Sequence, residues 1–223
     1  MGGPGGKFPM GAMAAGEMDE RKVKPVVVFR RYSMLQGCQA IKRRTRMAAS
    51  RRYFMFDPEK ALQVILWIAG RVRSANFHRI SKIVYFADRV HLQKYGRQIC
   101  GDSYSAMRHG PVPSGIYDML KAVRGDGHSP LVDKAKEAFD VVGKYNVVPK
   151  READADFFSE SDVECLDWAV KTYGRKSFDE LTRLSHDAAW KKTDENDLID
   201  ITTIIKTLPN AKELLEHLEG IER

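Results

Sequence analysis

Apolar residues recur every three or four positions along most of the chain after residue 57, which is the spacing of helices with one buried face. Asp57 and Pro58 have the residue types of an N-cap and a first helical position, so a helix is predicted to begin there. A second helix is predicted over Phe77–Tyr95 and ends at Gly96. A third is predicted from about Ser114, as its cap, to Val123. The pattern therefore indicates a mainly α-helical fold.

Serine followed three positions later by an acidic residue marks two further helix starts. Ser159 with Asp162 precedes a predicted helix that runs through Tyr173, and Ser177 with Glu180 precedes a short one. An amphipathic helix is also predicted after residue 209. These segments place most of the C-terminal half in helices.

The only convincing strand pattern lies between Phe139 and Val148, where β-branched and aromatic residues flank Gly143-Lys144. It predicts a small hairpin with a two-residue turn. Arg97–His109 shows no helical period and is expected to be an irregular loop, as is the segment leading to Phe139. The expected fold class is mainly α (α+β), a compact helical domain with one small β-hairpin.

Charge is distributed unevenly along the 223 residues. The formal net charge is +7, but residues 1–52 contain 12 Lys/Arg and 3 Asp/Glu, whereas the remainder contains 25 and 27. Residues 1–52 are accordingly expected to be a disordered basic extension. Residues 53–195 are expected to form the domain, and 196–223 a C-terminal helical extension packed on it.

The basic extension contains a cluster that could contact nucleic acid, formed by Lys42, Arg43, Arg44 and Arg46. Basic clusters attract phosphates, but this one has no interleaved aromatic residues and no recognisable nucleic-acid-binding module around it. A solvated tail is the favoured interpretation. A nucleic-acid-binding transcriptional regulator that uses this tail is the alternative.

Other classes of site find little support. Cys38, Cys100 and Cys165 show no metal-binding spacing, and neither do the histidines, so no metal and no cofactor are expected. Phosphate-binding and nucleophile motifs are absent from the sequence, which argues against an enzyme. A hydrolase built on Asp88, His91 and His109 would need these side chains to converge on one pocket.

Targeting features are also missing from the sequence. It contains neither a secretory signal pattern nor a run of roughly 20 apolar residues that could span a membrane. No membrane association and a cytoplasmic location are therefore expected.

An ordered series of motifs lies between Lys82 and Tyr117. It consists of Lys-Ile-Val-Tyr-Phe-Ala-Asp at 82–88, Tyr-Gly at 95–96, Gly-Asp at 101–102 and His-Gly-Pro-Val-Pro at 109–113, with Tyr117 beyond. This order resembles the Panacea (SocA-like) antitoxin domain family. The helix of the form Lys-Leu-x-Tyr-Tyr-Ala-Asp is matched with Ile83 and Phe86 as modest departures. The resemblance extends over roughly Pro58–Trp190. The motif positions, which are also candidates for partner binding, are Lys82, Tyr85, Asp88, His91, Asp102, Tyr104, His109, Gly110, Pro111, Val112, Pro113 and Tyr117.

The resemblance implies an antitoxin of a bacterial toxin–antitoxin pair, which neutralises a cognate protein toxin by direct binding. It does not name the toxin, because Panacea domains occur opposite unrelated toxins. Some relatives are thought to deliver the toxin to a protease, so a protease complex is a further implied partner. For His109–Pro113 a structural role is favoured over partner binding, since glycine and proline fix the backbone there.

Overall fold

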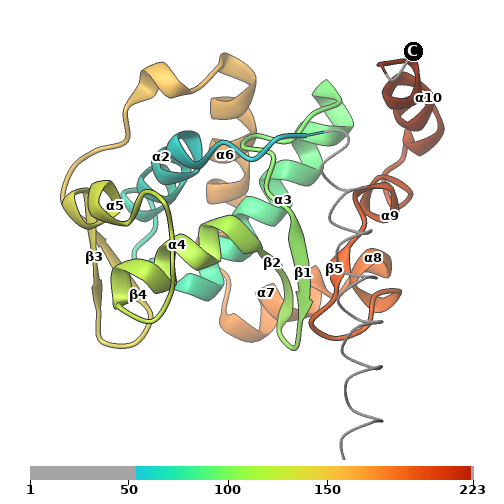
Figure 1. Ribbon diagram of the computed structural model, residues 1–223. Helices are drawn as coiled ribbons and strands as arrows, with labels where there is room; N and C mark the ends of the chain where they lie inside the picture. Colours follow the sequence, from blue (N-terminus) through green and yellow to red (C-terminus); the bar gives the residue numbers. More distant parts are fainter. Residues whose placement is uncertain (1–53, 222–223) are drawn as a thin grey trace, which may run out of the picture. The chain divides into compact units, whose positions relative to one another are not determined.

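The computed structural model describes residues 54–221 (Figure 1). Its helices are α2 (Pro58–Ala69), α3 (Phe77–Tyr95), α4 (Ser114–Arg124), α5 (Val132–Ala138), the 3-10 turn η1 (Ala155–Phe157), α6 (Glu160–Tyr173), α7 (Phe178–Ser185), α8 (Ala188–Lys191), α9 (Ile201–Ile205) and α10 (Ala211–Ile221). Its strands are β1 (Tyr104–Met107), β2 (Gly110–Pro113), β3 (Phe139–Val142), β4 (Asn146–Pro149) and β5 (Leu198–Ile199). The mainly α fold class is confirmed.

Helix α3 is the element around which the others pack. It contacts α2, α4, α6, α7 and α9, together with strand β2. In Figure 1 it runs behind α4, with α6 and α7 beside it. Its residues from Ile80 to Asp88 are all buried, as expected for a helix that is covered on most sides.

The predicted helix ends are set by local hydrogen bonds. The Asp57 side chain accepts from the Lys60 backbone N–H at 3.0 Å and caps α2. Helices α6 and α7 each begin with a reciprocal capping box, at Ser159 and Ser177 respectively. Gly96 ends α3 in the left-handed conformation, with φ of 68°, which glycine adopts without steric cost. These starts and stops are confirmed.

Two small antiparallel sheets complete the fold. The expected hairpin is present as β3 and β4, but its connection is the three-residue segment 143–145, so the predicted two-residue turn is wrong. The other sheet has the strand order β2-β1-β5, with Tyr104 opposite Pro113 on one side and Ile199 on the other. Strand β1 lies within Arg97–His109, so the expectation of an irregular loop there is wrong for Tyr104–Met107.

Other local expectations are also corrected. The segment before Phe139, expected to be a loop, contains α5. Ser114 does not cap α4. The N-cap is Pro113, which has no side-chain cap, and Asp102 from the preceding loop accepts from the backbone N–H groups of Gly115 (2.8 Å) and Ile116 (2.9 Å). A carboxylate distant in sequence thus replaces the local cap.

Buried apolar side chains form two clusters. The first fills the space among α2, α3, α4, α5 and α6 and includes Trp67. The second joins Tyr85 and Tyr104 to apolar residues of β5, α9 and α10, among them Ile204 and Leu218. Trp168 on α6 lies outside both clusters and is 41% exposed.

Some expectations lie outside the described residues, namely the disordered tail, the basic cluster Lys42, Arg43, Arg44 and Arg46, and Cys38. Cys100 and Cys165 are buried free thiols. Within residues 54–221, no helix combines the length and the apolar character needed to cross a bilayer.

Replacing Asp102 with alanine is expected to destabilise the fold by about 1–3 kcal/mol, because two N–H groups at the start of α4 lose their acceptor. Urea denaturation measures the change. Asp118→Ala is the matched control. Asp118 lies on α4, is exposed, and forms a surface ion pair with Lys121. Equal stability losses in the two variants would contradict this role for Asp102.

Candidate functional site

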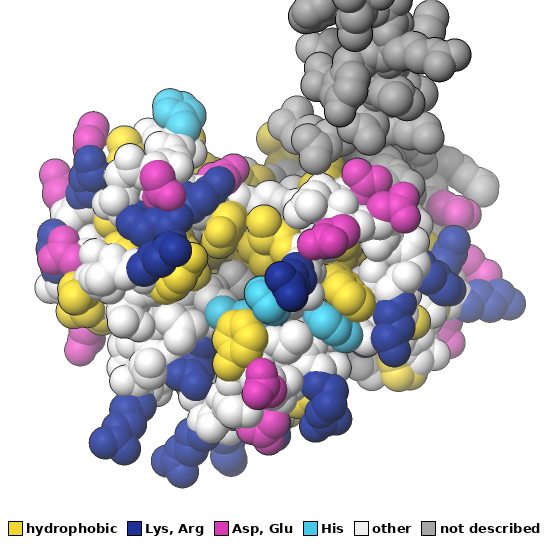
Figure 2. Space-filling model, turned by 90° about the horizontal axis from the view of Figure 1, so that it is seen from below, with side chains coloured by type: hydrophobic (Ala, Val, Ile, Leu, Met, Phe, Trp, Pro, Cys, Tyr) yellow, Lys and Arg dark blue, Asp and Glu magenta, His cyan; other side chains and the backbone are white. Residues whose placement is uncertain are grey.

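A cleft of about 670 Å³ lies where α3, α4, α7 and the two hairpins meet. Figure 2 shows this face of the molecule, on which histidine side chains gather around a hollow beside apolar and basic side chains. The lining residues are Asn76, Phe77, His78, Ser81, Lys82, Met107, Arg108, His109, Val112, Tyr117, Lys144, Tyr145, Asn146, Phe178, Glu195 and Asn196. The lining therefore combines aromatic side chains with several cations and one carboxylate.

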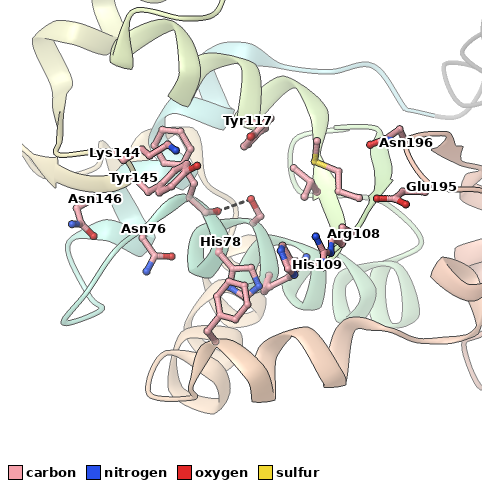
Figure 3. Close-up of a pocket in the computed structure, with 16 residues that line it drawn as sticks. Asn76, His78, Arg108, His109, Tyr117, Lys144, Tyr145, Asn146, Glu195 and Asn196 are labelled. Carbon is pink, nitrogen blue, oxygen red and sulfur yellow. Dashed lines mark hydrogen bonds between the residues drawn. The ribbon is translucent and has the colours of Figure 1, made fainter.

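The lining comes from segments far apart in sequence (Figure 3). Tyr117 on α4 faces His78 on α3 across the cleft, Tyr145 lies at one end, and Arg108 and Glu195 lie toward the other. The Phe77 ring, at the start of α3, makes edge contacts with Tyr117 and Tyr145. Packing of these rings fixes that end of the cleft.

Phe178 lies near the opening of the cleft and contacts two histidine rings. Its ring stacks on His78 with centroids 4.0 Å apart and makes an edge contact with His109 at 5.2 Å, yet 46% of the residue is exposed. The Nε2 atom of His78 lies 3.1 Å from the Thr182 hydroxyl. Burial, followed by the charge of Lys82, lowers the pKa of His78 to about 3, so this histidine is neutral at physiological pH.

Lys82 is fully buried at the inner side of the cleft. Its Nζ donates to the Pro111 carbonyl at 2.8 Å, and no carboxylate among residues 54–219 lies within ion-pair distance of it. Burial lowers the pKa of Lys82 to about 7. A buried ammonium without a counter-charge is costly, which makes Lys82 the most unusual charged group of the described fold.

Gly110 allows the β1–β2 hairpin to approach Lys82. Its φ is 98°, and a Cβ at this position would overlap the Ser185 hydroxyl and lie 2.9 Å from Lys82 Nζ. Glycine is therefore required by both the backbone conformation and the close approach. The turn that precedes it holds Arg108 and His109 exposed at the rim.

Other motif residues build the interior instead of the cleft. Asp88 is buried and accepts hydrogen bonds from the Ile99 backbone (2.8 Å) and the Tyr104 hydroxyl (2.7 Å). Gln98 Nε2 donates to the Asp102 carbonyl oxygen at 2.9 Å and lies 3.4 Å from Asp88. Burial raises the pKa of both carboxyl groups, that of Asp102 to about 7.

Tyr85, another motif residue, and Arg89, which is outside the motif, both bind Asp187 from α3. The Tyr85 hydroxyl donates to Asp187 at 2.6 Å, and Arg89 donates to the same carboxylate oxygen at 2.8 Å. Burial, then the charge of Asp187, raises the pKa of Tyr85. These contacts attach the segment after α7 to the middle of α3.

His91 belongs to a separate ionic cluster around Asp162. Its Nε2 lies 3.1 Å from the Asp162 carboxylate, which also pairs with Lys60 at 2.6 Å and Arg97 at 3.0 Å. Burial acts to raise the pKa of Asp162, but hydrogen bonds from His91, Lys60 and Ser159 outweigh it and hold the pKa well below its usual range. The cluster joins α2, α3 and α6.

The structure does not bring Asp88, His91 and His109 to one pocket. The first two are buried in different hydrogen-bond networks, and only His109 lines the cleft. In the part of the chain described, no three His, Cys, Asp or Glu side chains are grouped so as to hold a metal ion. The hydrolase arrangement is therefore not observed.

The profile of the family described as Antitoxin SocA-like, Panacea domain matches residues 80–191, half of the chain. The chain belongs to this family. The match confirms the resemblance, although it begins at residue 80 and leaves α2 outside. No curated protein and no solved structure matches the chain significantly.

Of the motif positions of the Panacea domain, four line the cleft: Lys82, His109, Val112 and Tyr117. The other cleft residues were not predicted from the sequence. Phe178 follows a capping serine as a single exposed aromatic residue, and His78 and Tyr145 carry no motif of their own. These residues come together only when the Panacea domain folds, because the contacts that build the cleft join residues about a hundred positions apart, such as His78 and Thr182. The sequence alone therefore gives no indication that they share a site.

Lys82→Met is expected to stabilise the Panacea domain at pH 6 by about 1–3 kcal/mol. The substitution removes an uncompensated buried charge, and this gain exceeds the cost of leaving the Pro111 carbonyl without its donor. An unfolded lysine has the ordinary pKa of 10.5, so between pH 7 and 10.5 the unfolded chain binds a proton that the native state does not. Native stability therefore rises with pH in this window, and the advantage of the variant shrinks.

Urea denaturation of the wild type and of Lys82→Met from pH 6 to pH 9.5 measures the difference in their free energies of unfolding. Lys171→Met, at an exposed position of α6, is the control and should leave the pH profile unchanged. A Lys82→Met protein that is less stable than the wild type by the same amount at every pH would contradict the argument.

Proposed function

We propose that this protein is an antitoxin that neutralises a cognate protein toxin by binding it directly, and that the cleft belongs to the binding face. Membership of the Panacea family is the observation that carries the proposal. The position of the cleft supports it, since Lys82, His109, Val112 and Tyr117 of the family motif contribute to its lining.

The chemistry of the cleft suits protein recognition. Phe178 and Tyr145 expose 46% and 43% of their surfaces beside the exposed cations Arg108 and Lys144. Aromatic residues and arginine are the types most often found as interface anchors. They are carried by helix ends and hairpin turns whose backbones are fixed by packing, which favours a preformed binding surface.

The family also supports a cytoplasmic site of action, which we include in the proposal.

Delivery of the bound toxin to a protease would be an additional activity. It predicts a shorter toxin half-life in cells that contain the antitoxin, whereas neutralisation by sequestration alone leaves the half-life unchanged or longer.

Co-expression with the product of the adjacent gene tests direct neutralisation. The neighbouring protein alone should arrest growth of a bacterial host, and addition of the antitoxin should restore growth and yield a complex that co-purifies. Persistent growth arrest with no complex, in cells that contain both folded proteins, would contradict the proposal.

Phe178→Ala is expected to weaken the purified complex by about 2 kcal/mol, roughly thirtyfold in Kd, because it removes the central exposed aromatic group of the cleft. Isothermal titration calorimetry measures the change. Trp168→Ala is the matched control: Trp168 is 41% exposed on α6 and is not part of the cleft lining. A loss of affinity in Trp168→Ala alone would place the binding face elsewhere.

A further inference from the structure

The most unusual electrostatic feature of the described residues is the missing counter-charge of Lys82. The other strongly buried acidic groups have partners: Asp162 contacts Lys60, Arg97 and His91, and Asp88 and Asp102 accept several hydrogen bonds. Lys82 donates one hydrogen bond to a neutral carbonyl. An ammonium group has three donors, so two of them lack a protein acceptor in the described residues.

The groups that face Lys82 do not supply a negative charge. On α3 the neighbouring titratable group is His78, on the β1–β2 turn it is His109, and at the end of α7 it is His186. Strand β2 offers the Pro111 carbonyl, and α7 offers the Ser185 hydroxyl near Gly110. These groups are neutral or cationic, so the charge of Lys82 is not offset by its surroundings.

The rim of the cleft has the same sign. Arg108 and Lys144 are exposed there, and Glu195 is the only acidic residue among those that line the cleft. Helix α3 begins at the cleft with no acidic residue in its first turn, so its N-terminal partial charge adds to the positive potential. Apolar walls strengthen this potential because they exclude water.

We propose that the cleft is a receptor for an acidic segment of a protein partner, whose carboxylate is attracted by the exposed cations of the rim and offsets, across the inner wall of the cleft, the charge of the buried Lys82. A flanking aromatic or aliphatic side chain of the same segment packs against Phe178 and Tyr145. The identification of that partner as the toxin rests on the proposed function. A carboxylate fits better than a phosphate, which is preferentially bound by bidentate arginines.

A second basic region provides an internal control. A groove at the ends of α2 and α6 is lined by cationic side chains and no carboxylate, the cations being Arg71, Arg73, Arg79, Lys171 and Arg175. We name it the basic groove. Non-specific attraction of acidic peptides would use this groove at least as well as the cleft, whereas recognition as proposed uses the cleft alone.

The test uses the full-length protein and an array of hexapeptides with Glu, Gln or Lys at a central position and Phe, Leu or Ala on either side. Glu peptides with an aromatic neighbour should bind at least tenfold more tightly than their Gln counterparts, and added salt should weaken them. Lys82→Met and Lys144→Glu should each abolish this preference. Arg73→Glu, an equal charge reversal in the basic groove, should retain it.

Calorimetry of the best peptide in buffers of different ionisation enthalpy adds a readout specific to Lys82. Binding at pH 8 should take up a proton, because a carboxylate favours the charged lysine, and this uptake should vanish in Lys82→Met but persist in His109→Gln. Thermal denaturation verifies that each variant is folded, and Lys144→Glu tests the proposal at an exposed position where folding is not at risk.

Several results would overturn the inference. They are equal binding of Glu and Gln peptides, a preference unchanged in Lys82→Met and Lys144→Glu, a preference lost only in Arg73→Glu, or a cleft that binds single-stranded oligonucleotides in place of the peptides. Acidic-peptide binding without toxin neutralisation would refute the proposed function alone. Neutralisation that survives every cleft substitution would refute the cleft as the toxin-binding face, and with it the acidic-segment receptor for the toxin, but would leave the antitoxin role intact.

Discussion

The buried carboxylate of Asp88 is the constraint on which the rest of the site depends. A carboxylate inside a helical core is tolerated only when its oxygens accept hydrogen bonds, and Asp88 finds its donors in the segment that follows α3. Its bonds to the Ile99 backbone and the Tyr104 hydroxyl hold that segment against the helix. Asp102, in the same segment, then caps α4. Two carboxylates therefore order a stretch without regular structure and connect α3, β1 and α4.

This arrangement explains why the family motif joins residues of two kinds. Asp88, Asp102 and Tyr104 fix the course of the chain into β1, and β1 determines where the β1–β2 turn lies. The β1–β2 turn then places Arg108 and His109 at the rim of the cleft. Motif residues that contact no partner still position the surface that we propose to be functional.

The helices could be predicted from the sequence because their signals are local. The sheet of β1, β2 and β5 could not, since β2 contains two prolines that resemble a turn and β5 pairs with β1 from about 95 positions away. Ser114 failed as a cap for the same reason, because the true acceptor, Asp102, is twelve positions upstream. The cleft was only partly predictable: Lys82 and His109 belong to a motif, but His78 and Phe178 meet them only through tertiary packing.

Lys82 also links stability to binding. A side chain that weakens the isolated fold can be retained when it serves a function, and local conflicts of this kind concentrate at functional sites. If a carboxylate occupies the cleft, it stabilises the charged lysine, and by linkage the charged lysine strengthens the binding of that carboxylate. The energetic cost of the unpaired ammonium in the free protein then becomes a source of selectivity, because a neutral segment of the same shape would leave the charge unpaired.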